Sequence, residues 1–149
     1  MAPGENARRV KVVLDEAYHP HSLAALLEAV RVHHPKRRIV LVLRPRGSGF
    51  SAGHFEARLP DALRLADRVL LADLPQPLRG LLAFDQAAVA AAARRLGAQV
   101  DTANEPDDFL PRLDRLVQPG DVVVTSVFHL DHAFPASLVE AVRRLPARR

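Results

Sequence analysis

The sequence contains no cysteine and no long hydrophobic run, and these two absences exclude several classes of protein. Without cysteine, neither a disulfide framework nor a thiolate metal site can form. No apolar stretch approaches the roughly 20 residues that a membrane-spanning helix needs. The first residues, Met1 to Asn6, lack the apolar core of a signal peptide. We therefore expect a cytoplasmic protein with no membrane partner.

Lysine and aromatic residues are also scarce, although the chain carries a formal net charge of +4. Lys11 and Lys36 are the only lysines, and aromatic residues make up 5% of the chain. The arginine clusters fall where strands begin and helices end, and cations at helix ends are ordinary partners of the helix dipole. A nucleic-acid-binding protein needs one basic face and a reading element, often with interleaved aromatics. The sequence therefore predicts no nucleic-acid partner.

A phosphate-binding loop is absent as well. The nearest candidate, Gly47-Ser48-Gly49, lacks the lysine and the spacing that hold the β- and γ-phosphates of ATP in a loop ending in Gly-Lys-Ser or Gly-Lys-Thr. We therefore expect that the isolated chain does not hydrolyse ATP, and we predict no catalytic residue in it. A length of 149 residues suits one domain with one core.

Hydrophobic periodicity predicts five strands that alternate with five helices. The predicted strands are 10–14, 38–43, 68–72, 98–102 and 121–125, and the predicted helices are 22–34, 54–66, 86–96, 104–118 and 135–145. Residues 38–43 are apolar almost throughout, which is typical of a parallel strand covered on both faces. Residues 78–83 are a candidate for a sixth strand.

This order predicts one α/β domain with a three-layer, Rossmann-like fold. We expect a mostly parallel five- or six-stranded sheet, helices on both faces and right-handed crossovers. Residues 1–9 would form a lead-in and residues 10–149 the domain. Asp85 is expected to cap one helix and Gly97 to end it. Ligands of open α/β sheets bind outside the carboxyl ends of the strands, so the loops after these strands form the candidate site.

Four segments carry a family resemblance, and one of them is residues 55–69, which resemble the family's helix ending in Ala-Asp-Xaa-Val. The stretch Asp15-Glu16-Ala17-Tyr18-His19-Pro20 resembles the pattern Asp-(Tyr/Phe/Gly)-Ala-His-(His/Asn)-Pro of the C-terminal domain of the Mur ligase superfamily, which includes peptidoglycan amino-acid ligases and folylpolyglutamate synthase. The loop Arg44-Pro45-Arg46-Gly47-Ser48 resembles the Pro-Arg-Ser loop of murein-peptide recycling ligases and the Pro-His-Arg loop of UDP-N-acetylmuramate–L-alanine ligases. Residues 120–126 resemble the family's last strand and loop. Glu16 and Tyr18 depart from the first pattern.

The resemblance implies the C-terminal domain of an ATP-dependent, amide-forming ligase of peptidoglycan synthesis or recycling. Such a domain closes over ATP and Mg²⁺ held by a central ATPase domain. The N-terminal and central domains, which would bring the nucleotide and a UDP-muropeptide or amino-acid substrate, are absent, so the isolated chain is expected to be inactive. By resemblance, the nucleotide-binding residues are Asp15, Tyr18 and His19, and the substrate-binding residues are Arg44, Arg46, Ser48, Ser126 and His129.

Other interpretations of the same residues stay open. Asp15 would also stabilise the dipole at a helix start, and the arginines would either fork onto a carboxylate or phosphate or remain solvated. The chain would alternatively be a stand-alone, non-catalytic binding module for a nucleotide, an anionic peptide or a partner protein. A flavodoxin-like regulator is a third alternative. We predict no metal site, although four histidines lie in these loops: His19, His21, His129 and His132.

Overall fold

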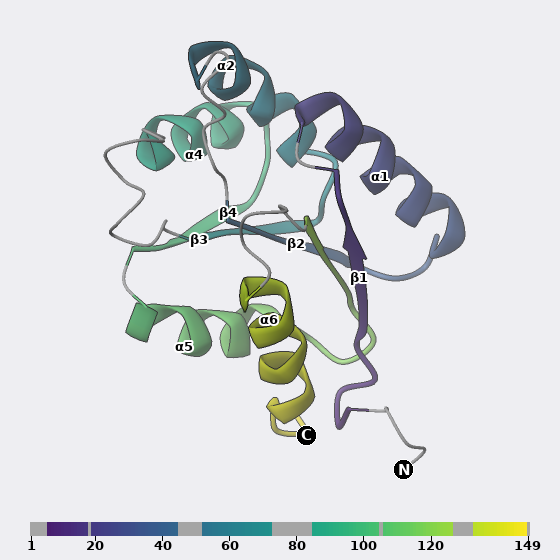
Figure 1. The fold of residues 1–149 in the computed structure, drawn as a ribbon. Coiled ribbons are helices and arrows are strands. Elements are labelled where there is room, and N and C mark those ends of the chain that lie inside the picture. The colour runs from purple at the N-terminus through teal and green to yellow at the C-terminus, as the bar shows by residue number, and fades with distance from the viewer. Residues whose placement is uncertain are drawn as a thin grey trace.

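The computed structural model describes residues 6–17, 19–44, 52–72, 85–104, 106–126 and 133–148. Five strands form one sheet in the order β1-β5-β2-β3-β4, and every pairing is parallel (Figure 1). The strands are β1 (Lys11–Asp15), β2 (Ile39–Leu43), β3 (Arg68–Ala72), β4 (Val100–Ala103) and β5 (Val122–Ser126). The helices are α1 (Pro20–His33), α2 (Ala52–Leu63), α4 (Gln86–Arg95), α5 (Pro106–Leu116) and α6 (Ala133–Arg144). The predicted α/β fold is confirmed; the candidate strand 78–83 lies outside the described residues.

The helices cover the sheet in two layers. Helices α1, α2 and α4 lie on one face, and α5 and α6 lie on the other (Figure 1). All five residues of β2 are buried, because Ile39, Leu41 and Leu43 pack into the first layer while Val40 and Val42 pack into the second. The apolar run that suggested a strand covered on both faces is therefore confirmed.

The strand order creates a topological switch on both sides of β5. The connections from β1 to β4 pass over the face of α1, α2 and α4, and the return to β5 passes over the opposite face through α5. The return connection from β4 to β5 runs in the opposite direction across the sheet and over the opposite face. Because both are reversed, this crossover has the same hand as the others, as the rule for parallel strands requires. Chains leaving β1 and β2 therefore enter one layer, whereas the chain leaving β5 enters the other. Ligands of open sheets bind at such a point.

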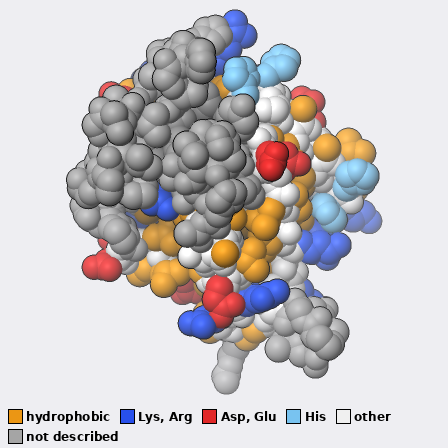
Figure 2. All heavy atoms as spheres, viewed as in Figure 1, with side chains coloured by type: hydrophobic (Ala, Val, Ile, Leu, Met, Phe, Trp, Pro, Cys, Tyr) orange, Lys and Arg blue, Asp and Glu red, His pale blue; other side chains and the backbone are white. Residues whose placement is uncertain are grey.

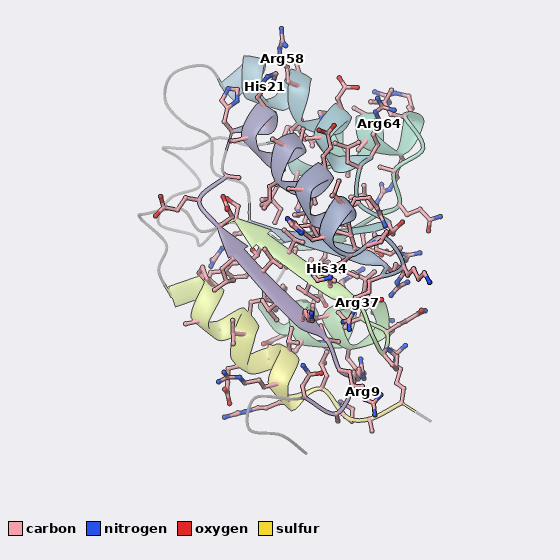
Figure 3. The ribbon with its side chains drawn as sticks, turned by 90° about the vertical axis from the view of Figure 1, so that its right-hand side faces the viewer. Arg9, His21, His34, Arg37, Arg58 and Arg64 are labelled. Atoms are coloured by element: carbon pink, nitrogen blue, oxygen red, sulfur yellow. The ribbon has the colours of Figure 1, made fainter. Side chains whose placement is uncertain are left out.

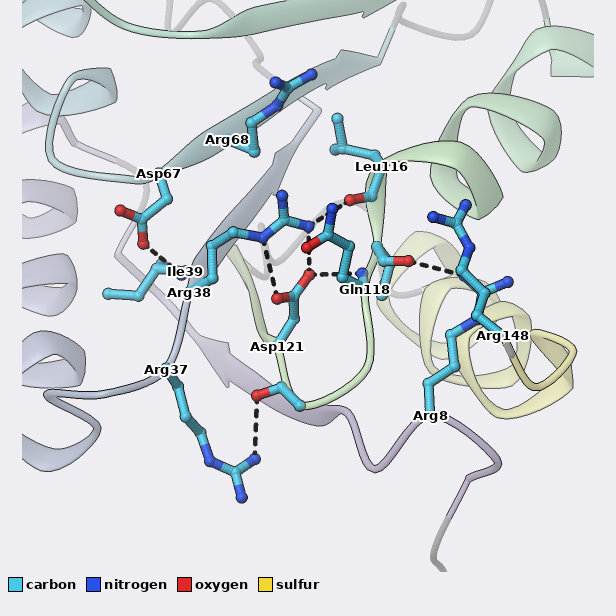
Figure 4. A network of polar contacts seen from close by, with 12 residues as sticks. Arg8, Arg37, Arg38, Ile39, Asp67, Arg68, Leu116, Gln118, Asp121 and Arg148 are labelled. Atoms are coloured by element: carbon cyan, nitrogen blue, oxygen red, sulfur yellow. Dashed lines mark hydrogen bonds and ion pairs between the residues drawn. The ribbon is translucent and has the colours of Figure 1, made fainter.

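Polar groups at the amino end of the sheet mostly bond to one another (Figure 4). Arg38 forks onto Asp121, with Nε–Oδ1 and Nη2–Oδ2 distances of 3.0 and 2.7 Å. Asp121 also accepts from the backbone N–H of Gln118 at 2.7 Å. Asp67 accepts from the N–H of Ile39 at 2.6 Å. This end of the sheet is therefore a structural network, which leaves the carboxyl end as the place for a ligand.

Arg8 connects three distant segments at the same end. Its side chain is 1% exposed and pairs with the Asp114 carboxylate. Nε donates to the carbonyl of Pro146 at 2.7 Å, and Nη1 donates to the carbonyls of Asp114 and Val117 at 2.9 and 2.8 Å. Through Arg8, the predicted lead-in contacts the end of α5 and the segment after α6.

Gly97 ends α4 with a φ of +91°, a conformation that strains L side chains. No heavy atom of the described chain lies within 4 Å of the place an added Cβ would take, so backbone strain alone sets the cost. We expect Gly97→Ala to lower the free energy of unfolding by about 1 kcal/mol, measured by urea denaturation. Gly97→Asn should lose less, because Asn tolerates this region; equal stability of Gly97→Ala and wild type would contradict the assignment.

Candidate functional site

Asp15 and Ser126 lie side by side at the carboxyl end of the sheet. They are register partners at the last positions of β1 and β5. Partners on adjacent strands share a face, and side chains alternate along each strand. Val13 and Val124, two residues earlier, both pack against the α1 layer, so Asp15 and Ser126 also face that layer. The structure thus brings together one residue predicted for the nucleotide and one predicted for the substrate.

The loop after Asp15 is a tight turn held by its own carboxylate. Oδ1 accepts from the backbone N–H of Ala17 at 3.0 Å, the pattern of an Asx turn. Ala17 is buried and anchors the loop, whereas Asp15 is exposed. Among the described residues, the second oxygen, Oδ2, has no hydrogen-bond partner. It is therefore placed to accept a hydrogen bond from a ligand hydroxyl or ammonium.

His19 caps α1, which begins at Pro20, two residues before the predicted start. Its backbone is extended (φ −85°, ψ 142°), and its Nδ1 accepts from the N–H of His21 at 3.2 Å. The Ser22 hydroxyl donates to the His19 carbonyl at 2.9 Å. A neutral imidazole whose Nδ1 accepts carries its proton on Nε2. His19 therefore offers one N–H donor at the exposed start of α1, where the helix dipole is positive.

Arg44 lies on the other face of the sheet. Leu43 packs into the α1 layer, so the next side chain points to the layer of α5 and α6. The guanidinium carbon lies 5.1 Å from the ring centroid of Phe134 on α6, a cation–π contact. Phe134 packs edge-on against Phe109 of α5, with centroids 5.6 Å apart. The sequence did not single out these two rings, yet they position Arg44 beside the start of α6.

Four predicted site residues lie outside the described part of the chain: Tyr18, Arg46, Ser48 and His129. Their roles stay predictions. Within the described ranges, no group of three or more His, Asp or Glu side chains is placed to hold a metal ion. No helix in these ranges is long and apolar enough to cross a membrane.

Residues 49–53 read Gly-Phe-Ser-Ala-Gly and match the Gly-Xaa-Ser-Xaa-Gly motif of a nucleophile elbow. In that motif the serine occupies a sharp turn directly between a strand and a helix. Here β2 ends at Leu43 and α2 begins at Ala52, so residues 44–50 separate the strand from Ser51. The connection does not have the length of an elbow, and no Ser-His-Asp catalysis follows from it.

An open parallel sheet, two helical layers and polar side chains at the ends of β1, β5 and β2 define a Rossmann-like domain with a candidate ligand site at the carboxyl end of the sheet. The family model described as "Mur ligase, glutamate ligase domain" matches residues 3–126, so the chain belongs to this family. The resemblance predicted from the sequence is confirmed.

The chain also resembles curated proteins in sequence and solved structures in fold. The chain is 28% identical over 120 residues to a UDP-N-acetylmuramate–L-alanine ligase of Psychrobacter cryohalolentis, covering 78% of the chain and 24% of that protein. It superposes on a murein peptide ligase from Psychrobacter arcticus with a TM-score of 0.71 and 19% identity, covering 98% of the chain and 30% of that ligase. A MurF ligase from Thermotoga maritima in complex with ADP matches with a TM-score of 0.51 and 20% identity, over 95% and 30% of the two chains. The chain therefore spans about a quarter of the length of its curated relative.

Proposed function

We propose that this chain is the C-terminal domain of an ATP-dependent, Mur-type amide-forming ligase of peptidoglycan synthesis or recycling. It would close over ATP and Mg²⁺ held by a central ATPase domain and help to place the incoming amino acid or peptide. The observation that carries the proposal is the pairing of Asp15 with Ser126 at the topological switch of a domain from this family, with His19 capping the helix that follows Asp15. Tyr18 would complete the nucleotide side.

The described residues suit the two sides of such a reaction differently. On the α1 face, the Asp15 carboxylate would accept from a ribose hydroxyl, and the His19 Nε2–H would donate to a phosphate oxygen. On the α6 face, Arg44 would bind a substrate carboxylate, because guanidinium matches a carboxylate with two parallel hydrogen bonds. Arg46, Ser48, Ser126 and His129 would add further contacts on the substrate side.

The chemical step would belong to the other domains. The carboxyl group of the UDP-muropeptide or other acid would be activated as an acyl phosphate on the central domain, and the incoming amine would displace the phosphate. This chain would contribute positioning and exclusion of water. It would therefore be inactive alone, with ATP and Mg²⁺ binding only when a central domain is present.

One observation favours a second candidate function. The Asx turn at Asp15 and the His19 cap are formed within this chain, without help from another domain. A pre-formed pair of this kind suits a stand-alone, non-catalytic module for a nucleotide, an anionic peptide or a partner protein.

Titrating the isotope-labelled chain with MgADP, and separately with a UDP-muropeptide, tests both functions by NMR. A ligase domain should give no saturable binding of either ligand and no ATP turnover. Any shifts at high ligand concentration should be small and lie at residues 15–22 and 126 for MgADP, and at residues 44 and 126 for the UDP-muropeptide. A stand-alone module should give saturable binding at the same residues. Turnover of ATP by the chain alone would contradict both functions, and so would shifts centred on Asp121 at the amino end of the sheet.

A further inference from the structure

The outer edge of β1 is the feature that the proposed function leaves unused. β1 ends the strand order and pairs with β5 alone. In Figure 3 it lies in the foreground, between α1 and α6, and no described strand covers it. The N–H of Lys11 donates to the carbonyl of Asp121, just before β5, at 3.1 Å. Because backbone groups alternate between the two edges of a strand, the N–H and C=O of Val12 and Leu14 point outward.

The chain itself shows that this edge accepts a peptide-like group. Val10 lies two residues before Val12 and presents its backbone to the same edge. The Asn6 side chain pairs with both of its groups: Oδ1 accepts from the Val10 N–H at 3.0 Å, and Nδ2 donates to the Val10 carbonyl at 2.7 Å. A carboxamide therefore reproduces the two bonds that a neighbouring strand would make. It marks where the open edge begins.

A groove of about 670 Å³ runs along the same edge. Its walls include Val10, the β1 residues from Lys11 to Leu14 and, from α6, Val139 and Val142. Leu14 is 45% exposed. The alternate side chains of an added strand would therefore find apolar surface beside α6.

The border of the groove is basic. Among the residues that the structure describes, four cations line it and no acidic residue does: Arg9, Lys11, Arg37 and Arg143. Lys, Arg and His side chains also gather at the end of α1 on the molecular surface (Figure 2). Two copies joined through β1 would bring like charges together, and charged edge residues of this kind oppose pairing between identical strands.

The pKa of His34 responds to the positive charges beside the groove. Partial burial, followed by the charges of Lys11, Arg37 and His33, lowers the pKa of His34 from its ordinary 6.5. Folding therefore disfavours the protonated form of His34. The neutral side chain costs the fold no stability above pH 6.5, and the free energy of unfolding falls as the pH drops from 6.5 toward the folded pKa. We expect an NMR titration to place this pKa below 6.5 and Lys11→Gln to raise it. A His34 pKa that stays the same in Lys11→Gln would contradict the contribution of this cation.

We propose that the outer edge of β1 docks an extended acidic segment of a partner protein, which adds a strand to the sheet. The segment would bond to the backbone groups of Val12 and Leu14, as in other cases of strand addition. Its carboxylates would lie toward the amino half of β1, near Lys11 and Arg143, and away from Asp15. This surface is separate from the ligand site at the carboxyl end of the sheet.

The probe is a dye-labelled, end-blocked peptide of sequence Val-Glu-Val-Asp-Val-Glu-Val, with binding measured by fluorescence anisotropy. Leu14→Pro removes an outward N–H and leaves the β5 ladder intact, because proline is tolerated on an edge strand. We expect it to weaken binding about tenfold or more, whereas the matched Leu14→Ala, which keeps the N–H, should stay within about threefold. Arg143→Glu should weaken binding as well. Circular dichroism checks that each variant is folded.

Four kinds of result would overturn the proposal. The first is no binding of the peptide to the wild-type chain. The second is equal binding by folded Leu14→Pro, or equal binding of an oligonucleotide of the same charge, either of which would mean electrostatic attraction without strand addition. The third is a dimer in sedimentation that Leu14→Pro abolishes, which would make a second copy the occupant. If Leu14→Pro does not fold, a peptide with N-methylated alternate amides replaces it, and undiminished binding of that peptide is the fourth.

Discussion

Replacing Arg8 with alanine should lower the free energy of unfolding by about 4 kcal/mol. The Arg8 side chain is almost completely buried and its guanidinium bonds to three backbone carbonyls and one carboxylate. Alanine would leave those carbonyls without their donor and open a cavity between the first described residues, α5 and the segment after α6. Urea denaturation followed by circular dichroism gives the free energy directly.

Two further variants distinguish the loss of the Arg8 hydrogen bonds from the loss of one positive charge. Arg144→Ala removes an exposed pair with Glu140, four residues earlier on α6, and should cost less than about 0.5 kcal/mol. Arg8→Lys keeps the charge but cannot reach four acceptors with one ammonium, so it should lose most of the stability that alanine loses. Equal losses for Arg8→Ala and Arg144→Ala would contradict the structural role of Arg8.

Asp15→Ala should slow amide formation about thirtyfold in a ligase that contains this chain. The assay protein joins the chain to the N-terminal and central domains of a UDP-N-acetylmuramate–L-alanine ligase. The expected loss corresponds to about 2 kcal/mol, the size of one hydrogen bond to a charged acceptor. The readout is the steady-state rate of amide product at saturating ATP.

Asp15→Asn distinguishes ligand contact from loop shape. Asparagine keeps an oxygen for the Ala17 N–H and so keeps the turn, but it loses the charge. We expect its rate to fall between those of wild type and alanine. Asp61→Ala is the matched control and should leave the rate unchanged, because the Asp61 side chain is exposed and its Oδ1 lies 3.8 Å from the Nε of Arg64. Wild-type rates for both Asp15 variants would exclude this carboxylate from the site.

Local chemistry explains why much of the fold was predictable. The apolar run of β2 and the cap at Asp85, whose Oδ1 accepts from the Ala88 N–H at 2.9 Å, depend on residues close in sequence. The same holds for Gly97. The predicted start of α1, Ser22, lies two residues after the observed one. The usual preference for Ser, Thr, Asp or Asn as the N-cap does not point to His19, although Pro20 suits the first helical position.

The remaining features depend on contacts between distant segments. Arg8 donates hydrogen bonds to carbonyl groups 106 to 138 residues away, and the residues near it in the sequence do not predict these contacts. The same is true of the contact between Arg44 and Phe134 and of the insertion of β5 between β1 and β2. That insertion decides which predicted site residues share a face: Asp15 joins Ser126, and Arg44 lies on the other side.

The most direct test of the ligase-domain proposal compares the joined ligase with the same ligase truncated before its C-terminal domain. Both proteins should bind ATP through the central domain. We expect that only the joined protein forms the amide product, and that the 149-residue chain alone consumes no ATP. A joined protein with a folded C-terminal domain that forms product no faster than the truncated ligase would contradict the proposed role of this chain as a ligase domain.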